Sequence, residues 1–284
     1  THSIDQYYVG KTYGEIWGYE TDRLYQVDDF AHDANGNLIL VTTESGKKIN
    51  QLSDPNAATQ EELQAGDFVF GPGDVKFKDL NGDGVIEDGS RQTNDHGDLK
   101  IIGNSTPRYE YSFRASADFK GIDFSIFFQG IGKRDIWGDG FLAIPGYNSA
   151  DGAMPQAFAG DFWREDRTDA FYPAPYNQGG SSTTLNMQRQ TRYLLNMAYL
   201  RIKNITLGYT IPTAVTERVH INKLRVYASL ENFFTFDHLG TLPIDPEVIS
   251  GISMWRDDDR YNAGRTGVAV PAFKSVSMGL QLSF

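Results

Sequence analysis

The sequence predicts an all-β protein whose long strands form an antiparallel transmembrane β-barrel with long extracellular loops. Five segments alternate apolar and polar residues over a length near the roughly 9–11 residues of a membrane-crossing strand. The connections between them alternate between short and long, and the chain ends on an aromatic residue, Phe284, on the apolar face. A soluble β-sandwich would also alternate, but its strands are typically about 5–6 residues long. Strand length and loop asymmetry therefore favour the barrel.

Composition excludes several functional classes. The 284 residues carry 26 Lys and Arg against 37 Asp and Glu, a net charge of −11 without a basic cluster, which argues against nucleic acid as a partner. There is no Cys, so disulfides, cysteine metal sites and thiol catalysis are excluded. No run approaches the roughly 18 apolar residues of a membrane helix, whereas a barrel disperses its apolar residues in alternation.

Residues 1–107 are irregular and rich in turns, and we expect them to form an extracellular loop region. Within them, residues 33–49 predict a small hairpin whose turn is Asn35-Gly36, a dipeptide that readily takes positive φ. Residues 108–284 are expected to hold the C-terminal barrel strands, interrupted by long loops at 138–191 and 238–270.

A loop at residues 79–90 resembles the first half of a calcium-binding loop. Oxygen-bearing side chains recur at alternate positions, and a glycine follows where such a loop turns sharply. The candidate ligands are Asp79, Asn81, Asp83, Val85 and Glu87. Ser90 stands at the twelfth position, where a bidentate acid is usual, so the alternative is a turn whose side chains cap their own backbone.

The first long hairpin has the clearest alternation in the chain. From Tyr109 to Phe119 every second residue is apolar or Ala, and after Lys120-Gly121 the pattern resumes over 122–129. Because successive strand side chains point to opposite faces, this pattern predicts two strands with one apolar and one polar side.

Three further strands follow, over 199–212, 223–236 and 275–284. In the first of them Arg201 and Lys203 have the parity of the apolar face, so we expect a shift of register there or an end that stands clear of lipid. The connections 120–121 and 212–222 are short, whereas 138–191 and 238–270 are long.

Several ordered strings resemble the C-terminal part of the SusC/RagA family of TonB-dependent outer-membrane transporters. They include GDVKFKDLNGDGVIEDGSR, the hairpin region from IIGNSTPRYEYSF to KRDIW, FWREDRTDAFYPAPY, YLRIKNITLGYTIP with LRVYASLENFFTF, and a DPE motif before a terminal strand ending in Phe. GEIWGYETDRLYQ is similar to the Gly-Tyr stretch that precedes this region in the family. The resemblance covers residues 10–284.

The resemblance implies a 22-stranded barrel with a plug, in the outer membrane of a Gram-negative bacterium of the Bacteroidota type. It implies import of oligosaccharides or peptides with energy from TonB, under a SusD-like surface lipoprotein. Five strands cannot close a barrel, and an open edge in lipid leaves backbone groups unpaired. The expected partners are therefore the plug and upstream strands of the same transporter, the SusD-like lipoprotein, TonB through the N-terminal part, and lipid or lipopolysaccharide.

Two sets of side chains are candidates for function. Loop aromatics suit stacking on sugar rings or packing on a partner, with packing among the loops themselves as the alternative. They are Trp137, Tyr147, Trp163, Tyr172 and Trp255. Charged residues on the polar strand faces are expected to face the lumen and line the solute path, or to pair with one another. They are Glu110, Arg114, Asp118, Arg225 and Glu231.

Catalysis has little support in the sequence. The five His residues have no paired-ligand spacing, and there is no GxSxG or phosphate-binding glycine loop. The acidic run Asp257-Asp258-Asp259 leaves glycoside hydrolysis as a minor alternative. The sequence thus predicts a non-enzymatic importer that requires no cofactor, with possible Ca²⁺. The main alternative is a secreted, calcium-stabilised β-sandwich that binds carbohydrate.

Overall fold

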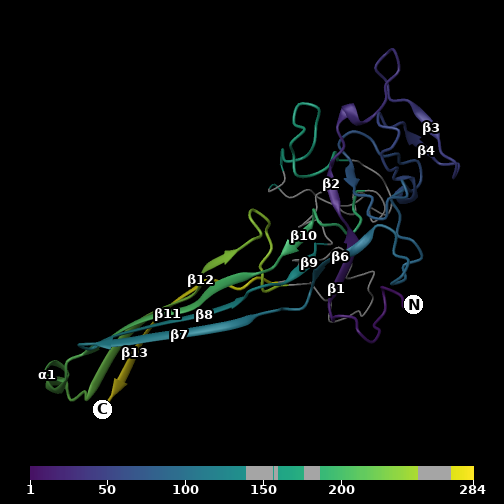
Figure 1. Cartoon of the computed structure of the whole chain (residues 1–284). Coiled ribbons are helices and arrows are strands. Elements are labelled where there is room, and N and C mark those ends of the chain that lie inside the picture. The colour runs from purple at the N-terminus through teal and green to yellow at the C-terminus, as the bar shows by residue number, and fades with distance from the viewer. Residues whose placement is uncertain (139–155, 157–158, 176–185, 249–269) are drawn as a thin grey trace.

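A computed structural model describes residues 1–138, 156, 159–175, 186–248 and 270–284. The described chain has two parts, a long projecting antiparallel sheet and a cluster of short strands and loops at one end of it (Figure 1). We name the second part the loop globule. Within the described ranges, no helix is long and apolar enough to cross a membrane.

The projecting sheet has five strands in the order β13-β12-β11-β8-β7. Every neighbouring pair is antiparallel. The strands are β7 (Glu110–Phe119), β8 (Ile122–Ile131), β11 (Tyr199–Ile211), β12 (Lys223–Asp237) and β13 (Ser275–Ser283). They contain 10, 10, 13, 15 and 9 residues, which is the length predicted from their alternation.

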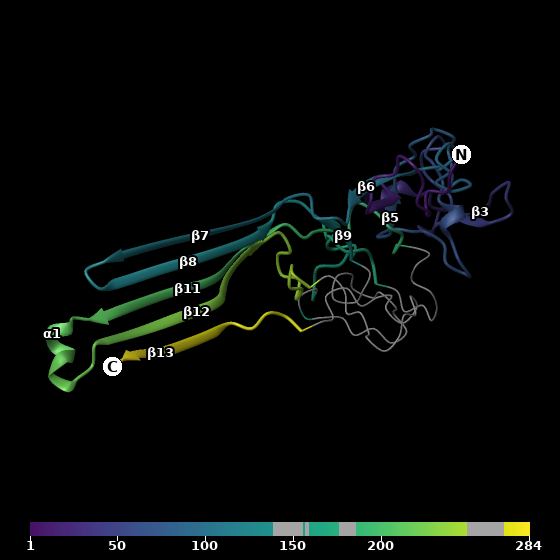
Figure 2. The ribbon, with the colours of Figure 1, turned by 90° about the horizontal axis from the view of Figure 1, so that it is seen from below.

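The predicted alternation of short and long connections is confirmed. Lys120 and Gly121 join β7 to β8 with φ angles of 48° and 84°, a left-handed pair that suits a two-residue hairpin turn. A short helical connection, α1 (Thr213–Thr216) with η4 (Glu217–Val219), joins β11 to β12. Both short connections lie at the end of the sheet away from the loop globule, and the described residues of the long connections, 159–175, 186–191 and 238–248, lie at the end near it (Figure 2).

The predicted register shift near Arg201 and Lys203 is also confirmed. Pairing of β11 with β8 and with β12 shifts between Ile202 and Asn204. Lys203 is an extra residue relative to β8, whereas two unpaired residues of β12, 232 and 233, lie opposite it. Such a bulge re-aims side chains without ending the strand. As a result Ile202 above the bulge and Ile205 below it both lie on the apolar face, opposite Phe128 and Ile126 of β8.

The loop globule is built from pairs of short strands. β1 (Glu15–Tyr19) pairs with β6 (Leu99–Asn104), β2 (Thr21–Leu24) with β5 (Val75–Phe77), β3 (Leu40–Thr42) with β4 (Lys48–Asn50), and β9 (Asp135–Trp137) with β10 (Leu194–Asn196). Single-turn 3₁₀ helices form at η1 (Val27–Asp29) and η2 (Glu61–Leu63).

The small hairpin exists, but the prediction that Asn35-Gly36 turns it is wrong. Strands β3 and β4 are joined through residues 43–47, where Gly46 has a φ of 82°. Asn35-Gly36 forms a separate preceding turn, because the Asp33 carboxylate accepts the backbone N–H groups of Asn35 and Asn37. Two glycine turns close together left the sequence pattern ambiguous.

A hydrophobic core of described residues holds the loop globule together. It joins Val75 and Ile86 from the first 107 residues to Tyr193, Met197 and other residues of the later loops. The predicted boundary near residue 107 marks where the long strands begin. The hydrophobic core nevertheless contains residues from before this boundary and from after it. The described residues of the later loops, such as Trp163 and Tyr193, pack in this core with residues of the first segment.

Candidate functional site

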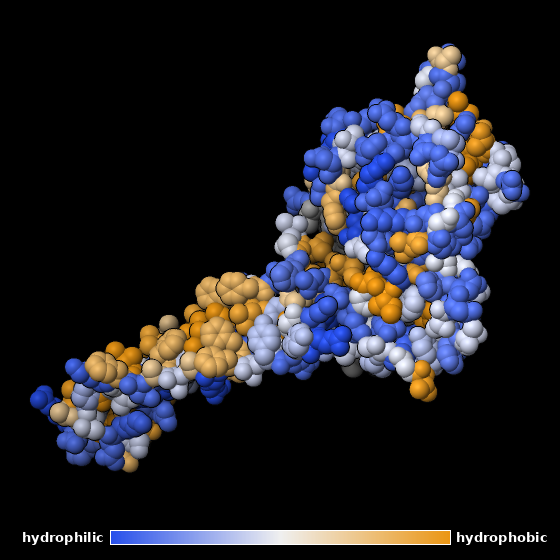
Figure 3. All heavy atoms as spheres, viewed as in Figure 1, coloured by the Kyte–Doolittle hydropathy of each residue, from blue (hydrophilic) through white to orange (hydrophobic). Residues whose placement is uncertain are grey.

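One face of the five-stranded sheet is apolar along its whole width. Partner residues on neighbouring strands form continuous rows, of which one runs Ala117, Phe124, Leu207, Ala228, Met278. Leu207 is 54% exposed and Met278 is 83% exposed, although both are large apolar side chains. Figure 3 shows these hydrophobic side chains gathered on the projecting sheet. An apolar patch of this extent marks a surface that is covered by lipid or by another molecule.

The opposite face is polar in matching rows. One row runs Ser116, Ser125, Thr206, Ser229, Ser277, with one residue from each strand. The strand registers place all five predicted lumen-facing residues, Glu110, Arg114, Asp118, Arg225 and Glu231, on this polar face. That the face lines a lumen stays a prediction, since the described strands do not close a barrel.

An ion pair spans the three central strands of the polar face near the turn end of the sheet. Arg225 on β12 donates through Nε to Oδ1 of Asp123 on β8 at 2.8 Å. It passes over Gly208 of β11, where a Cβ atom would lie 2.4 Å from the same carboxylate oxygen. The glycine therefore leaves the space that lets side chains two strands apart meet. Of the predicted lumen-facing charges, Arg225 has this partner, and Arg114 lies over the Phe127 ring at 5.2 Å.

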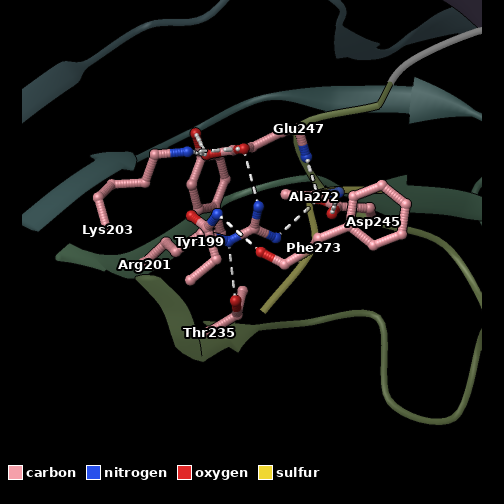
Figure 4. Close-up of polar contacts among 9 residues, drawn as sticks. Tyr199, Arg201, Lys203, Thr235, Asp245, Glu247, Ala272 and Phe273 are labelled. Atoms are coloured by element: carbon pink, nitrogen blue, oxygen red, sulfur yellow. Dashed lines mark hydrogen bonds and ion pairs between the residues drawn. The ribbon is translucent and has the colours of Figure 1, made fainter. Parts of the chain in front are cut away.

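A second polar cluster lies where the sheet meets the loop globule, and we name it the loop anchor. It comprises Tyr199, Arg201, Lys203, Thr235, Asp245 and Glu247. The Arg201 guanidinium donates to Thr235 at 2.8 Å, to Glu247 at 2.8 Å and to Asp245 at 2.7 Å (Figure 4). The Arg201 side chain is only 5% exposed, so its charge is neutralised by these partners rather than by water.

The two acids of the loop anchor satisfy several donors each. Glu247 accepts hydrogen bonds from the Tyr199 hydroxyl and the Lys203 ammonium, both at 3.0 Å. Asp245 also accepts the backbone N–H of Glu247 at 2.9 Å and that of Ala272 at 3.1 Å. Burial acts to raise the pKa of Asp245, but the Arg201 guanidinium and the two amides hold that pKa below its ordinary value.

Sequence reasoning did not identify the loop anchor. Two signals for it were visible, the basic residues Arg201 and Lys203 at apolar parity and the Asp245-Pro246-Glu247 motif. Neither signal connects the two segments, which are separated by more than 40 residues. Their meeting depends on the bulge and on the path of the loop.

The structure describes three of the five candidate loop aromatics. Trp163 and Tyr172 are buried, at 6% and 7% exposure, and Trp137 is half-buried. The Trp163 ring packs against Gly73, and the Tyr172 ring stacks on Tyr193 at 5.9 Å. This favours the packing alternative, while ligand binding stays a prediction. Tyr147 and Trp255 lie outside the described residues.

The 79–90 loop is closed by its own side chains. Asp79 accepts the backbone N–H groups of Gly82 and Gly84, and Asp83 accepts that of Val85. Asn81 also bonds to Asp83, through its side-chain amide. These are the bonds expected of a turn that caps its own backbone.

A buried carboxylate that lies outside the motif also binds the backbone of this loop. Asp98 is fully buried and accepts the amides of Leu80 and Glu87. Burial and the nearby carboxylates of Asp83 and Asp95 raise the pKa of Glu87, so a cation here would relieve repulsion. In the part of the chain that the structure describes, no group of three or more His, Cys, Asp or Glu is arranged to hold a metal ion. Calcium binding stays a prediction.

A polar hollow of about 350 Å³ opens between the first residues of the loop globule and the base of β7. Its lining includes two bases and two acids, Arg108, Lys133, Glu15 and Asp135. One carboxylate oxygen of Glu15 is buried with no hydrogen-bond partner among the described residues. The hollow can therefore accept a solute that carries both donors and acceptors.

A meander of long strands, apolar on one face and polar on the other, is typical of membrane β-barrels. No family model matches the chain. TonB-dependent receptor P3 of Formosa agariphila is 28% identical over 218 residues, which is 75% of this chain and 19% of the receptor. TonB-dependent receptor P39 of the same organism is 24% identical over 241 residues, which is 80% of this chain and 21% of that receptor.

Solved structures show the same fold. The RagAB peptide transporter aligns with a TM-score of 0.51 at 17% identity, over 95% of this chain and 23% of that chain. The RagAB peptide importer in its open-open state aligns with a TM-score of 0.50 at 18% identity, over 98% and 24%. These comparisons confirm the resemblance to SusC/RagA-like TonB-dependent proteins. The chain spans about a fifth of the length of the curated relatives it matches.

Proposed function

We propose that this chain forms the last membrane strands and the extracellular loops of a TonB-dependent importer in a Gram-negative outer membrane. In this proposal the apolar sheet face contacts lipid, the polar face lines the lumen, and the loop globule lies outside the cell. Upstream strands of the same transporter, up to the 22 of the family, would pair with the edges β7 and β13 and close the barrel. No covalent chemistry is required of the chain.

The observation that carries this proposal is the exposed apolar face of the five long strands. The buried hydrophobic cluster lies in the loop globule, and within the described residues no second sheet packs on the apolar face. A soluble β-sandwich would need such a second layer. The strands of 9–15 residues also exceed what a sandwich of ordinary size uses.

The solute is proposed to be an oligosaccharide or a peptide, captured together with a SusD-like surface lipoprotein. Support for a polar oligomer comes from the mixed charges of the polar hollow and of the polar sheet face. Support for a lipoprotein partner comes from the structural neighbours, which are RagAB assemblies. Energy would reach the plug from TonB through the N-terminal part of the transporter.

Lipid contact is testable because the chain contains no Cys, so a single introduced thiol reports on one position. Leu207→Cys and Thr206→Cys are adjacent in β11 and point to opposite faces. Each is placed in the full-length transporter, labelled with a small fluorophore and reconstituted into vesicles with or without brominated lipid. We expect strong quenching at position 207 and little at position 206.

Two results would contradict the proposal. Equal quenching at both positions would show that the apolar face does not contact lipid. A full-length protein that stays soluble without detergent would favour the secreted carbohydrate-binding alternative. Glycan-cleaving activity that is lost when loop acids are neutralised would instead support the hydrolase alternative.

A further inference from the structure

The loop anchor lies on the polar face of the sheet. Arg201 pairs with Gln129 of β8 and with Thr235 of β12, and Gln129 in turn pairs with Ser112 of β7, which has the parity of Glu110 and Arg114. The segment 238–248 therefore crosses the polar face where β11 and β12 approach the loop globule. It does not cross the apolar face.

Two kinds of contact hold this segment. Leu239 and Ile244 are buried, at 5% and 6% exposure, within the hydrophobic core of the loop globule. Asp245 and Glu247 are bound by the Arg201 guanidinium. Asp245 in addition accepts the amide of Ala272, the residue that leads towards β13. The segment is thus fixed by apolar burial on one side and by charge on the other.

The bulge in β11 makes this double contact possible. In a regular strand Arg201 and Lys203 would lie on one face and Asn204 on the other. The extra residue shifts the register at this point. Lys203 then reaches Glu247 at 3.0 Å, beside the bond from Arg201 to the same carboxylate. The two bases and two acids neutralise one another, so the loop anchor offers little free charge to a passing solute.

We propose that Arg201 is a positioning residue that fixes residues 238–248 as a permanent part of the wall at the mouth of the solute path. This rests on the proposed function in one respect, that the polar face lines that path. The fork of the guanidinium is required, because its three bonds run in different directions to Thr235, Asp245 and Glu247. The segment stays in place with or without solute.

The test uses Ile244→Cys in the full-length transporter as a reporter of whether the segment leaves the wall. Ile244 is buried, so reaction with a membrane-impermeant maleimide is slow while the segment is fixed. We expect R201Q to raise the labelling rate about tenfold, in line with local opening of a segment that has lost its main polar contacts. R201K keeps the charge without the fork, and we expect a rate at least about threefold above the parent.

The matched control is R225Q, which also breaks an arginine–carboxylate ion pair on the polar face but touches no loop residue. R225Q should change the labelling rate of Ile244→Cys by less than about twofold. D245N added to R201Q should raise the labelling rate by less than the product of the two single effects, since the two residues share one ion pair. Folding of each variant is checked by resistance of the unboiled barrel to SDS.

An unchanged rate in R201Q, a parental rate in R201K or an equal rise in R225Q would each overturn the inference. These outcomes are independent of lipid contact, which is measured by quenching at position 207. If quenching at position 207 fails, the proposed function fails. If quenching holds and R201Q does not alter labelling at position 244, only the role of Arg201 is refuted.

Discussion

Leu207→Arg tests the energetic consequence of the lipid-facing assignment. Leu207 lies four residues before the end of β11 at Ile211. At about 3.3 Å per residue and a tilt near 40°, it sits roughly 10 Å from the turn end of the sheet, close to the middle of an apolar band about 25 Å tall. An arginine at that depth on the lipid face costs about 2–4 kcal/mol.

The assay is reversible urea unfolding of the full-length barrel in vesicles, followed by tryptophan fluorescence. Thr206→Arg is the matched control, because it adds the same side chain one position away on the polar face, beside Ser125 and Ser229. We expect the free energy of unfolding to fall by about 2–4 kcal/mol for L207R and by less than about 1 kcal/mol for T206R. Equal losses, or a larger loss for T206R, would refute the assignment of faces.

Three further predictions follow from the polar contacts. Gly208→Ala should lower the free energy of unfolding by about 1 kcal/mol, because a Cβ displaces the Arg225 ion pair; the loss should vanish in an R225Q background. Folding lowers the pKa of Asp245, so the ionised carboxylate stabilises the folded protein. This stabilisation is complete above the ordinary carboxylate pKa of about 3.9, and it is lost as the pH falls through the lower pKa of the folded state. The labelling rate of Ile244→Cys must be divided at each pH by that of the same thiol in the urea-unfolded protein, because only the thiolate reacts. This ratio should be flat from neutral pH to about pH 5 and rise only below about pH 4, and D245N should abolish that rise. Asp98→Ala should cost about 2–3 kcal/mol by leaving buried amides unpaired, measured as faster amide hydrogen exchange in the loop globule; no change in exchange would contradict it.

Much of the sheet followed from the sequence because its pattern is local. Period-two alternation identified all five long strands, and Lys120-Gly121 marked the first turn through its left-handed backbone. The parity of Arg201 and Lys203 predicted either a shift of register or a strand end clear of lipid, and the structure has the shift. Each of these signals lies within one or two neighbouring segments, where backbone geometry leaves few alternatives.

The sites were harder to predict because they depend on contacts between distant segments. The sequence left Trp163 and Tyr172 open between ligand or partner contact and packing among the loops, and it did not indicate that they join a core with residues of the first segment such as Val75. The loop anchor joins β11 to a segment more than 40 residues later. Asp98 supports the 79–90 loop from outside its motif. The spacing of residues along the sequence does not indicate which of these segments contact one another.

The most direct test of the central claim is a nitroxide scan of residues 204–211 in β11, one Cys at a time, in the reconstituted full-length transporter. Oxygen concentrates in lipid and a nickel chelate concentrates in water, so their relaxation effects separate the two environments. We expect collision with oxygen to peak at positions 205, 207 and 209 and the chelate effect to peak at positions 204, 206 and 208, in the period-two pattern of the strand. A scan without alternation, or with chelate access on both faces, would contradict a lipid-facing sheet.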